Sequence, residues 1–421
     1  MAKLAINGGP KAVNEQLGKP LYAEWPEIGD EERDALMAVL ESRRWWRGGY
    51  GEDELDKCWV AKFENAFMEY QGGKYAVACT NGTQAIEMAL KAVGIQPGDE
   101  IIVPCSTFVA TATACVLVNG IPIIVDVEPE TYQIDPDAIE GAITPRTAGI
   151  IPVHNGGFPC DMDRINAIAE KHGLFVIEDS AHAQGSQYKG KGCGTLGDFG
   201  TFSLQMGKTL TCGEGGIVTT NDADLAAKAF AYHHIGRFAG RPFYEHHLVA
   251  SNLRMTEWQG AIAYSQSQRL LEQTFRRESN AKHFEAGLRE IEGVAPMERR
   301  PEVTRWGFYF YHFKFQSTQF GGITKGRFQE ALAAEGLGTG SGHLHPIQKN
   351  PLFTNRQFGP VCWPAGADAP DYGQIETPVA DRILAEEGIS MGHSMFLGGK
   401  DDMDLMLTAI RKVRENVGEL G

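Results

Sequence analysis

Between residues 74 and 220, short apolar runs alternate with segments of helical periodicity, and this alternation restricts the fold more than any other feature. The apolar runs are KYAVACT, DEIIVPC, PIIVDV, AGIIPV, LFVIED, FGTFSL and GGIVTT. The helical segments between them include TQAIEMALKAVG, TATACVLVNG and DMDRINAIAEKHG. Strands that are apolar along their whole length are covered on both faces, and in α/β proteins the covering elements are helices. We therefore predict an α/β fold with a seven-stranded, mostly parallel sheet.

The rest of the chain predicts two domains and an arm. A chain of 421 residues fits one large and one smaller domain. Residues 30–43 are expected to form an amphipathic helix with Asp30 as its N-cap, and residues 256–291 a long helix. After that helix, FYFYHFKF predicts a strand and GRFQEALAAEG another helix. We expect an N-terminal arm (1–29), a large domain (30–290) and a small C-terminal α+β domain (291–421).

Composition excludes several classes of protein. The net charge of −15 argues against binding to nucleic acid or another polyanion. No apolar stretch approaches the roughly 20 residues of a membrane-spanning helix. The first residues lack the apolar core of a signal peptide, so a cytoplasmic protein is expected. The eight cysteines form no CxxC pair and several lie in strand-like runs, which favours reduced, buried thiols over disulfides or zinc ligands.

Two polar features follow predicted strands, where an open α/β sheet gathers its ligands. Thr80-Asn81-Gly82-Thr83 joins the run KYAVAC to a helix, and free backbone N–H groups at a helix N-terminus can seat a phosphate. Asp179 ends the run LFVIED, where its carboxylate could face the pyridine nitrogen of pyridoxal 5′-phosphate (PLP) and keep it protonated. Each feature alone has a structural explanation, since the turn could simply cap a helix and Asp179 could do the same.

Two further features complete this constellation. Lys208 lies between the run FGTFSL and a glycine-rich turn, in surroundings that could desolvate its amine as a Schiff-base lysine requires. Ser203 could add a hydroxyl to the phosphate, and Phe108 could lie flat on a cofactor ring. A surface lysine and a core phenylalanine are the ordinary interpretations of these residues. All four features follow strands of one predicted sheet, in the chain order Thr80–Thr83, Phe108, Asp179 and Lys208. Together they favour a PLP enzyme.

Two other patterns are not interpreted as sites. Residues 192–197 match GxGxxG, but they follow polar residues and lead into a strand, the reverse of the context that dinucleotide binding needs. The pairs His233-His234 and His246-His247 are adjacent in sequence, so their side chains diverge, and no HExxH is present. We expect neither NAD nor a metal ion.

Several motifs resemble the sugar aminotransferases of the DegT/DnrJ/EryC/StrS family. They are CTNGTQAIEMAL, IPVHNGG, VIEDSAHAQG, FSLQMGKTLTCGEGG and SNLRMTEWQGA, and the likeness runs from about residue 2 to the end of the chain. The segments RRWWRGGYG and HLHPIQKNPLF make the chain most similar to glutamine:scyllo-inosose aminotransferases and to 3-amino-5-hydroxybenzoate synthases. This resemblance implies an aspartate-aminotransferase-like fold (PLP fold type I) and a homodimer with shared active sites.

The resemblance also implies roles for individual residues. Lys208 would link covalently to PLP and shuttle a proton, Asp179 would pair with the pyridine nitrogen, and His182 would hydrogen-bond the phenolic oxygen. The remaining cofactor contacts would be Gly82, Thr83 and Ser203 at the phosphate, Phe108 on the ring and Asn252 at the phosphate of a neighbouring subunit. Many relatives have glutamine in place of His182, but histidine also occurs in the 3-amino-5-hydroxybenzoate synthases, so this residue does not separate the branches.

The reaction expected is transfer of an amino group from glutamine or glutamate to a keto-sugar or keto-cyclitol, as in aminosugar or aminocyclitol antibiotic biosynthesis. Candidate substrate contacts in predicted loops are Trp46, Arg47, His154, His345 and His393. Few arginines near the site would favour a neutral cyclitol, although Arg237 and Arg241 could serve a nucleotide diphosphate. Dehydration, aromatisation or a non-catalytic binding role on the same fold remain alternatives. A family dehydratase with histidine in place of the lysine is disfavoured because Lys208 is kept.

Overall fold

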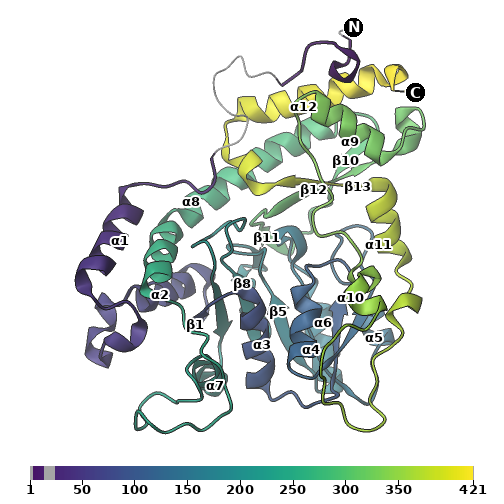
Figure 1. The fold of residues 1–421 in the computed structure, drawn as a ribbon. Coiled ribbons are helices and arrows are strands. Elements are labelled where there is room, and N and C mark those ends of the chain that lie inside the picture. The colour runs from purple at the N-terminus through teal and green to yellow at the C-terminus, as the bar shows by residue number, and fades with distance from the viewer. Residues whose placement is uncertain (1–2, 14–23, 421) are drawn as a thin grey trace.

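The computed structural model describes residues 3–13 and 24–420, and its largest feature is a seven-stranded sheet (Figure 1). The strand order across the sheet is β1-β9-β8-β5-β4-β2-β3. The strands are β1 (Tyr75–Cys79), β2 (Glu100–Pro104), β3 (Ile121–Val125), β4 (Thr147–Ile150), β5 (Phe175–Asp179), β8 (Phe199–Ser203) and β9 (Gly216–Thr220). All seven apolar runs predicted as strands lie in this sheet, so the predicted fold class is confirmed.

Strand β9 runs antiparallel to both of its neighbours, whereas the other neighbouring pairs in the large sheet are parallel. The reason lies in the connection from β8. Parallel neighbours need a long crossover, usually a helix, but residues 204–215 form a turn without a helix. The chain therefore returns beside β8 in the opposite direction, and Lys208 lies in this turn. The other six strands point the same way, so their carboxyl ends share one edge of the sheet.

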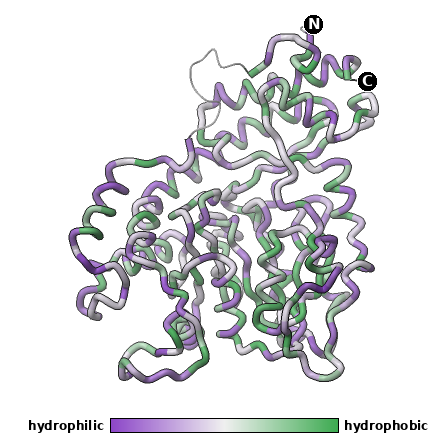
Figure 2. The backbone as a smooth tube through the Cα atoms, in the orientation of Figure 1, coloured by the Kyte–Doolittle hydropathy of each residue, from purple (hydrophilic) through white to green (hydrophobic). Residues whose placement is uncertain are grey.

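Both faces of the sheet are buried, as the apolar runs predict. Successive strand residues point to opposite faces. Val77 packs in the hydrophobic cluster that includes helix α3 (Gly82–Val93), and its neighbour Ala78 packs in the cluster that includes helix α2 (Trp59–Gln71). Ile101 and Ile102 also point to opposite faces, and Ile102 packs in the cluster that includes helices α5 (Pro136–Gly141) and α6 (Met162–His172). Figure 2 shows hydrophobic residues concentrated along the central strands and hydrophilic ones on the outer helices.

The helices that surround this sheet and extend beyond it are α1 (Asp30–Ser42), α2 (Trp59–Gln71), α3 (Gly82–Val93), α4 (Ala110–Leu117), α5 (Pro136–Gly141), α6 (Met162–His172), α7 (Ala223–His233), α8 (Glu257–Leu288), α9 (Lys325–Ala334), α10 (Pro351–Thr354), α11 (Pro378–Arg382) and α12 (Lys400–Glu415). The helix predicted at 30–43 is present, but Gly29 rather than Asp30 is its N-cap, because the Gly29 N–H donates to Glu32 Oε2 at 2.8 Å.

Seven of the eight cysteines are buried and Cys362 is exposed. None of the helices in the described ranges is both long and apolar enough to cross a membrane.

Helix α8 runs from the large sheet to the C-terminal part of the chain (Figure 1). Beyond it, β10 (Val294–Pro296), β12 (Phe310–Phe315) and β13 (Gly388–Gly392) form an antiparallel sheet in the order β10-β12-β13. A second small sheet joins β11 (Val303–Arg305) to β6 (Gln187–Tyr188) and β7 (Lys191–Gly192). The predicted strand FYFYHFKF and helix GRFQEALAAEG correspond to β12 and α9. The domain limits at residues 29 and 290 stay predictions.

The described part of the N-terminal arm packs on the C-terminal part of the chain, a point that the sequence leaves open. The N–H groups of Ala5 and Ala12 both donate to the carboxylate of Glu335, each at 2.8 Å. Glu335 is fully buried and also accepts from Lys412 Nζ at 2.7 Å. This buried carboxylate thus links the described N-terminal segment to helix α12, and Figure 1 shows this segment close to α12.

Candidate active site

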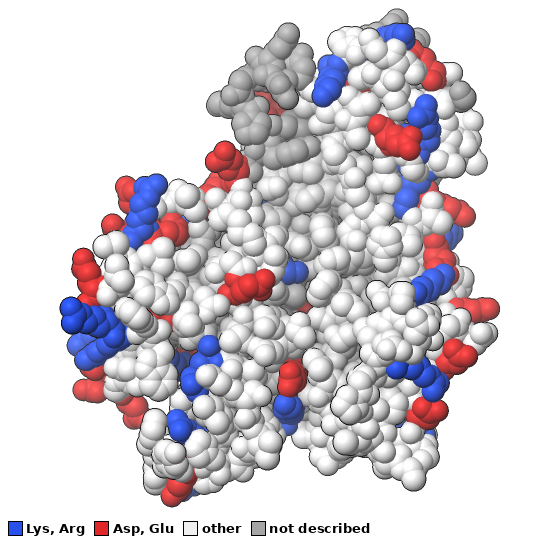
Figure 3. Space-filling view, in the orientation of Figure 1, with Lys and Arg blue, Asp and Glu red and all other residues white. Residues whose placement is uncertain are grey.

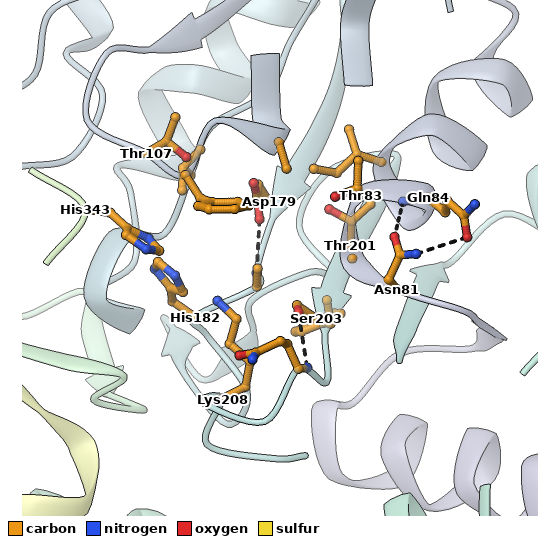
Figure 4. Close-up of a pocket in the computed structure, with 18 of the residues that line it drawn as sticks. Asn81, Thr83, Gln84, Thr107, Asp179, His182, Thr201, Ser203, Lys208 and His343 are labelled. Atoms are coloured by element: carbon orange, nitrogen blue, oxygen red, sulfur yellow. Dashed lines mark hydrogen bonds between the residues drawn. The ribbon is translucent and has the colours of Figure 1, made fainter. Parts of the chain in front are cut away.

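A cavity of about 960 Å³ lies at the carboxyl ends of the parallel strands. Its walls include the start of α3, the end of β5, the turn after β8 and the residue before β12. Figure 4 shows the side chains of Asp179, His182 and Lys208 facing one space, with Ser203 and Thr83 beside them. The sequence predicts a site at this edge of the sheet, and these five predicted residues all line the cavity.

Lys208 provides a buried amine in this cavity. Its side chain is 7% exposed, and its backbone N–H closes a tight turn by donating to Gln205 O at 2.8 Å. Burial lowers the pKa of the Lys208 amine to about 8, although the negative charge of Asp179 acts in the opposite direction. A substantial fraction of this amine is therefore neutral near physiological pH, and a neutral amine can attack a carbonyl carbon or accept a proton.

Asp179 ends strand β5 and is 5% exposed. Burial raises the pKa of this carboxyl group, while hydrogen bonds from Thr111 and from the Ala181 N–H, together with the charge of Lys208, lower it. Thr111 Oγ1 donates to Oδ2 at 2.7 Å and the Ala181 N–H to Oδ1 at 3.1 Å. These donors hold the carboxylate in a fixed orientation and favour its ionised form.

His182 is held as a neutral hydrogen-bond donor. Its Nδ1 accepts from the Gly156 N–H at 3.3 Å, so the proton of the neutral ring is assigned to Nε2. Burial, reinforced by the charge of Lys208, keeps the pKa of His182 well below its usual value. The Nε2–H of this ring can therefore donate to an oxygen atom in the cavity over the physiological pH range.

The start of α3 fits a phosphate group. Asn81 is the N-cap, and its Oδ1 accepts from the Gln84 N–H at 2.9 Å. The N–H groups of Gly82 and Thr83 lie in the first turn, where the helix offers no carbonyl to accept from them. A Cβ atom on Gly82 would lie 2.8 Å from Ser203 Cβ, so only glycine fits there without a shift. An anion at this helix N-terminus would meet backbone donors and the positive end of the helix dipole.

Phe108 also lines the cavity, from the loop between β2 and α4. Its side chain is 54% exposed, which is unusual for a phenylalanine next to a buried sheet. Its ring centroid is 5.5 Å from that of His343. An aromatic face left open in this position could stack on a flat ligand ring.

Two cavity residues, His343 and Tyr309, are not predicted from the sequence. The HLHP segment points to His345, but His343 lines the cavity while His345 is exposed and lies outside it. The segment is a turn with Gly342 at φ +53°, so spacing along the sequence does not indicate which histidine points inward. Tyr309 lies in FYFYHFKF, whose aromatic residues suggest a buried strand, yet β12 begins only at Phe310 and Tyr309 faces the cavity.

The other candidate histidines lie outside the cavity. His154 is fully buried: its Nε2 is 2.9 Å from Glu178 Oε2, and its Nδ1 accepts from the Cys160 N–H at 3.0 Å. His393 is buried behind the lysine turn, with its Nε2 3.1 Å from Gly207 O. The structure thus places His154 in the protein core and His393 beneath the lysine turn.

A second cavity has a volume of about 360 Å³ and is lined by Arg47, Arg237, Arg241 and Arg254. Trp46 lies next to it, against Arg254. Arg47 donates to Glu64 Oε1 at 2.6 Å, and the Arg254 guanidinium lies 5.3 Å from the Trp46 ring centroid. Asn252 is exposed nearby and pairs through its backbone with His234. The described structure therefore brings none of these residues to the lysine cavity within one chain.

The GxGxxG match at 192–197 has an internal partner. The carboxylate of Glu178, which is fully buried, accepts from the N–H groups of Gly194, Leu196 and Gly197 at 2.7 to 2.8 Å. The turn follows the two-residue strand β7 and leads into β8, with no helix to receive a pyrophosphate. Its backbone donors thus bind a side chain of the same protein.

Over residues 3–13 and 24–420, no group of three or more His, Cys, Asp or Glu side chains is arranged to hold a metal ion.

Comparison with known proteins places this geometry in a family. Residues 26–386 match the DegT/DnrJ/EryC1/StrS aminotransferase family. The chain belongs to this family. This aminotransferase is 36% identical to L-glutamine:2-deoxy-scyllo-inosose aminotransferase of Micromonospora echinospora, over the full length of both chains. It is 35% identical to L-glutamine:scyllo-inosose aminotransferase of Streptomyces griseus, over 100% of this chain and 99% of that one. The crystal structure of 3-amino-5-hydroxybenzoic acid synthase superposes with a TM-score of 0.82 at 31% identity, covering 94% of this chain and 99% of that one.

The family depends on PLP, and the cavity of this aminotransferase fits the functional groups of that cofactor. The glycine at position 82 lets the start of α3 lie close to Ser203, and the free N–H groups of this first turn match a phosphate. The buried amine of Lys208 matches an aldehyde, and the oriented carboxylate of Asp179 matches a pyridine nitrogen. The donor Nε2–H of His182 matches a phenolic oxygen. Each group of the cofactor thus has a complementary residue on the wall of one cavity.

Proposed function

We propose that this aminotransferase uses PLP, bound in the lysine cavity, to move an amino group from glutamine or glutamate to a keto-cyclitol or keto-sugar. One observation carries this proposal. Lys208 follows β8 and Asp179 ends β5, yet both face one cavity, next to the free N–H groups at the start of α3. The names of the inosose aminotransferases that this chain resembles support glutamine as the donor and a cyclitol as the acceptor.

The charge of the cavity supports a neutral acceptor. Among the described residues that line it, the charged ones are Glu87, Asp179, Glu214 and Lys208, and none is an arginine. A nucleotide-linked sugar carries a diphosphate, which usually needs arginine or lysine partners. On the face shown in Figure 3, charged side chains gather at the edges and the middle is mostly uncharged. Within one chain, a polyhydroxylated ketone therefore fits this cavity better than a nucleotide sugar.

The residues of the chain divide the work of the reaction. When bound, PLP supplies an aldehyde that exchanges amino groups and a ring that withdraws electrons from a neighbouring C–H bond. Asp179 would hold the proton of the ring nitrogen, and the Nε2–H of His182 would orient the ring by donating to its oxygen. Nζ of Lys208 takes the proton from the α-carbon of the donor and later returns a proton to the carbon of the ketone. The donor leaves as a 2-oxo acid and the ketone leaves as an amine.

We further propose that the active form is a cytoplasmic homodimer in which Asn252 of one subunit reaches the phosphate of the other. Asn252 is exposed and lies away from the lysine cavity of its own chain, which is compatible with a role across an interface. Analytical ultracentrifugation checks the assembly. PLP titration of Asn252→Ala checks the contact, with weaker binding expected.

A second candidate reaction is transamination coupled to dehydration. It is favoured by the likeness to 3-amino-5-hydroxybenzoic acid synthase, because the product in that name is aromatic and a hydroxylated ring becomes aromatic by losing water. The deciding experiment incubates the purified enzyme with PLP, glutamine or glutamate, and a panel of keto-cyclitols and nucleotide keto-sugars. Mass spectrometry then identifies the product. An amine that keeps all hydroxyl groups of the ketone supports simple transamination, and loss of water supports the second reaction. A nucleotide sugar accepted in preference to every cyclitol would overturn the proposed acceptor class.

A further inference from the structure

The ring of Tyr309 contacts both Lys208 and His182, two of the residues proposed to act on the cofactor. Nζ of Lys208 lies 4.3 Å from the centroid of the Tyr309 ring. The imidazole of His182 stacks on the same ring, with centroids 4.2 Å apart and planes inclined by 23°. An ammonium group over an aromatic face is attracted by the ring quadrupole, and this attraction grows when water is excluded.

The backbone fixes Tyr309 relative to His182 through a shared residue. The Tyr309 N–H donates to Gly156 O at 3.0 Å, while the Gly156 N–H donates to His182 Nδ1 at 3.3 Å. Gly156 has φ +67°, and a Cβ atom there would lie 2.9 Å from His312 Nε2 and 3.0 Å from Phe310 O. Only glycine makes this turn without strain. The ring stack is therefore set by the backbone on both sides and does not depend on the chance packing of two loose side chains.

We propose that Tyr309 is a positioning residue, whose ring holds the amine of Lys208 and the imidazole of His182 at fixed places on the cavity wall. The inference rests on the proposed role of Lys208 but goes beyond it. Without the ring, the four-carbon side chain of lysine would sample several rotamers, and each lost orientation lowers the fraction of productive encounters. The hydroxyl of Tyr309 is not required for this role, because both contacts involve the face of the ring.

The titration of Lys208 offers a test that does not depend on turnover. The groups that act on this amine come from every wall: Asp179 from β5, His182 from the following turn, His343 from the turn before Leu344, and His393 from beneath the lysine turn. Burial keeps the three imidazoles uncharged near neutral pH, so Asp179 is the charged partner that acts on the amine. The ring of Tyr309 adds its own stabilisation to the ammonium form, and removing the ring should make Lys208 easier to deprotonate.

The experiment uses the full-length protein freed of cofactor, with PLP itself as the probe. The rate of PLP capture, followed by absorbance, is measured across neutral and alkaline pH for the wild type, Tyr309→Leu and Tyr309→Phe. In the wild type the rate should rise with pH around a midpoint near the pKa of Lys208, about 8. In Tyr309→Leu the midpoint should fall by roughly half a pH unit or more, the size of a desolvated cation–π contact. Tyr309→Phe, which keeps the ring, should restore the midpoint.

Contact with His182 gives a second readout. Tyr309→Leu and His182→Asn should weaken PLP affinity non-additively, because each variant removes one side of the same stack. An unshifted midpoint in a folded Tyr309→Leu, or an equal shift in Tyr309→Phe, would overturn the inference. Should Tyr309→Leu not fold, Tyr309→Phe decides alone, since a shift there assigns the effect to the hydroxyl. Wild-type protein that captures no PLP would instead refute the proposed function and is thereby distinguishable.

Discussion

The hydroxyl of Thr111 donates a hydrogen bond of 2.7 Å to Oδ2 of Asp179, and both groups are buried. Thr111 in turn lies 2.7 Å from the hydroxyl of Thr107, so a short chain of hydroxyls ends on the carboxylate. Thr111 comes from α4 and Asp179 from the end of β5. A helix that follows one strand therefore orients the carboxylate at the end of another.

We predict that Thr111→Val weakens PLP binding. The substitution keeps the side-chain volume but removes a donor to a buried charged group, a contact of about 1.5–3 kcal/mol, so the dissociation constant should rise about tenfold or more. The pKa of Asp179 should also rise further, because this hydrogen bond is one of the groups that lower it. Fluorescence titration with PLP measures the effect. Thr113→Val on the same helix is the matched control, since that hydroxyl donates to Ala110 O and Thr113 is not among the described residues that line the cavity. Equal affinities in both variants would contradict the prediction.

Lys208→Ala should abolish both turnover and the absorbance band that arises when PLP is joined covalently to the lysine. The variant still has Asp179 and the N–H groups at the start of α3, which are proposed to bind the phosphate, so it should retain weak, non-covalent binding of the cofactor. Absorbance spectroscopy and an amino-transfer assay measure the two losses. Lys228→Ala, on the exposed surface of α7, serves as the control and should retain both properties. A Lys208→Ala protein with full activity would refute the assigned role.

Asp179→Asn should lower the pH midpoint of PLP capture below about 8. Burial lowers the pKa of Lys208, and the charge of Asp179 partly opposes that effect, so neutralising the carboxylate removes the opposing influence. Capture needs the neutral amine and should therefore reach its plateau at lower pH. Turnover should nevertheless fall by roughly two orders of magnitude or more, because the ring nitrogen loses its charged partner. Glu214→Gln, at an exposed carboxylate of the same cavity, should leave the midpoint in place. A midpoint that rises in Asp179→Asn would show the opposite sign of coupling.

His343→Leu should raise the KM for the ketone by about tenfold, the loss expected for one or two hydrogen bonds. His343 lines the cavity, and its Nδ1 is buried without a hydrogen-bond partner among the described residues. Burial lowers the pKa of His343 to about 4, so the neutral ring can serve a hydroxyl as donor or acceptor. His345→Leu, two residues along and outside the cavity, is the control. Steady-state kinetics should separate the two variants, and an equal effect in both would place the substrate elsewhere.

The difference between His343 and His345 shows where sequence reasoning stops. Strand positions were predictable because apolar runs record burial, and residues after strand ends share one edge of the sheet. This is why Lys208 and Asp179 could be assigned to one cavity. A turn such as 340–346 has no period, so the direction of each side chain depends on the φ and ψ angles of its glycines. Tyr309 was missed for a related reason, because it stands one residue before an aromatic strand.

His154 was a candidate substrate contact because it follows a strand in the segment IPVHNGG. A histidine that binds ligand and one that binds a buried carboxylate occupy the same place in such a pattern. The partner that distinguishes them, Glu178, is 24 residues away along the chain. Pairing of this kind depends on the register between β4 and β5, which periodicity alone does not give.

Glu178→Ala should destabilise the fold more than any of the substitutions in the cavity. The Glu178 carboxylate is fully buried and accepts from three backbone N–H groups of the turn at 194–197 as well as contacting His154. Removing it leaves these donors buried without an acceptor, a loss of about 3–5 kcal/mol in the free energy of unfolding. Urea unfolding measures the loss.

Glu130→Ala, at an exposed carboxylate, should change the same quantity by less than about 0.5 kcal/mol. Because Glu178 adjoins Asp179, a loosened turn should also weaken PLP binding, and high PLP concentrations should restore part of the lost stability by mass action. A Glu178→Ala protein as stable as Glu130→Ala would mean that water replaces the carboxylate at these donors. In that case the turn at 192–197 could accept an external anion after all.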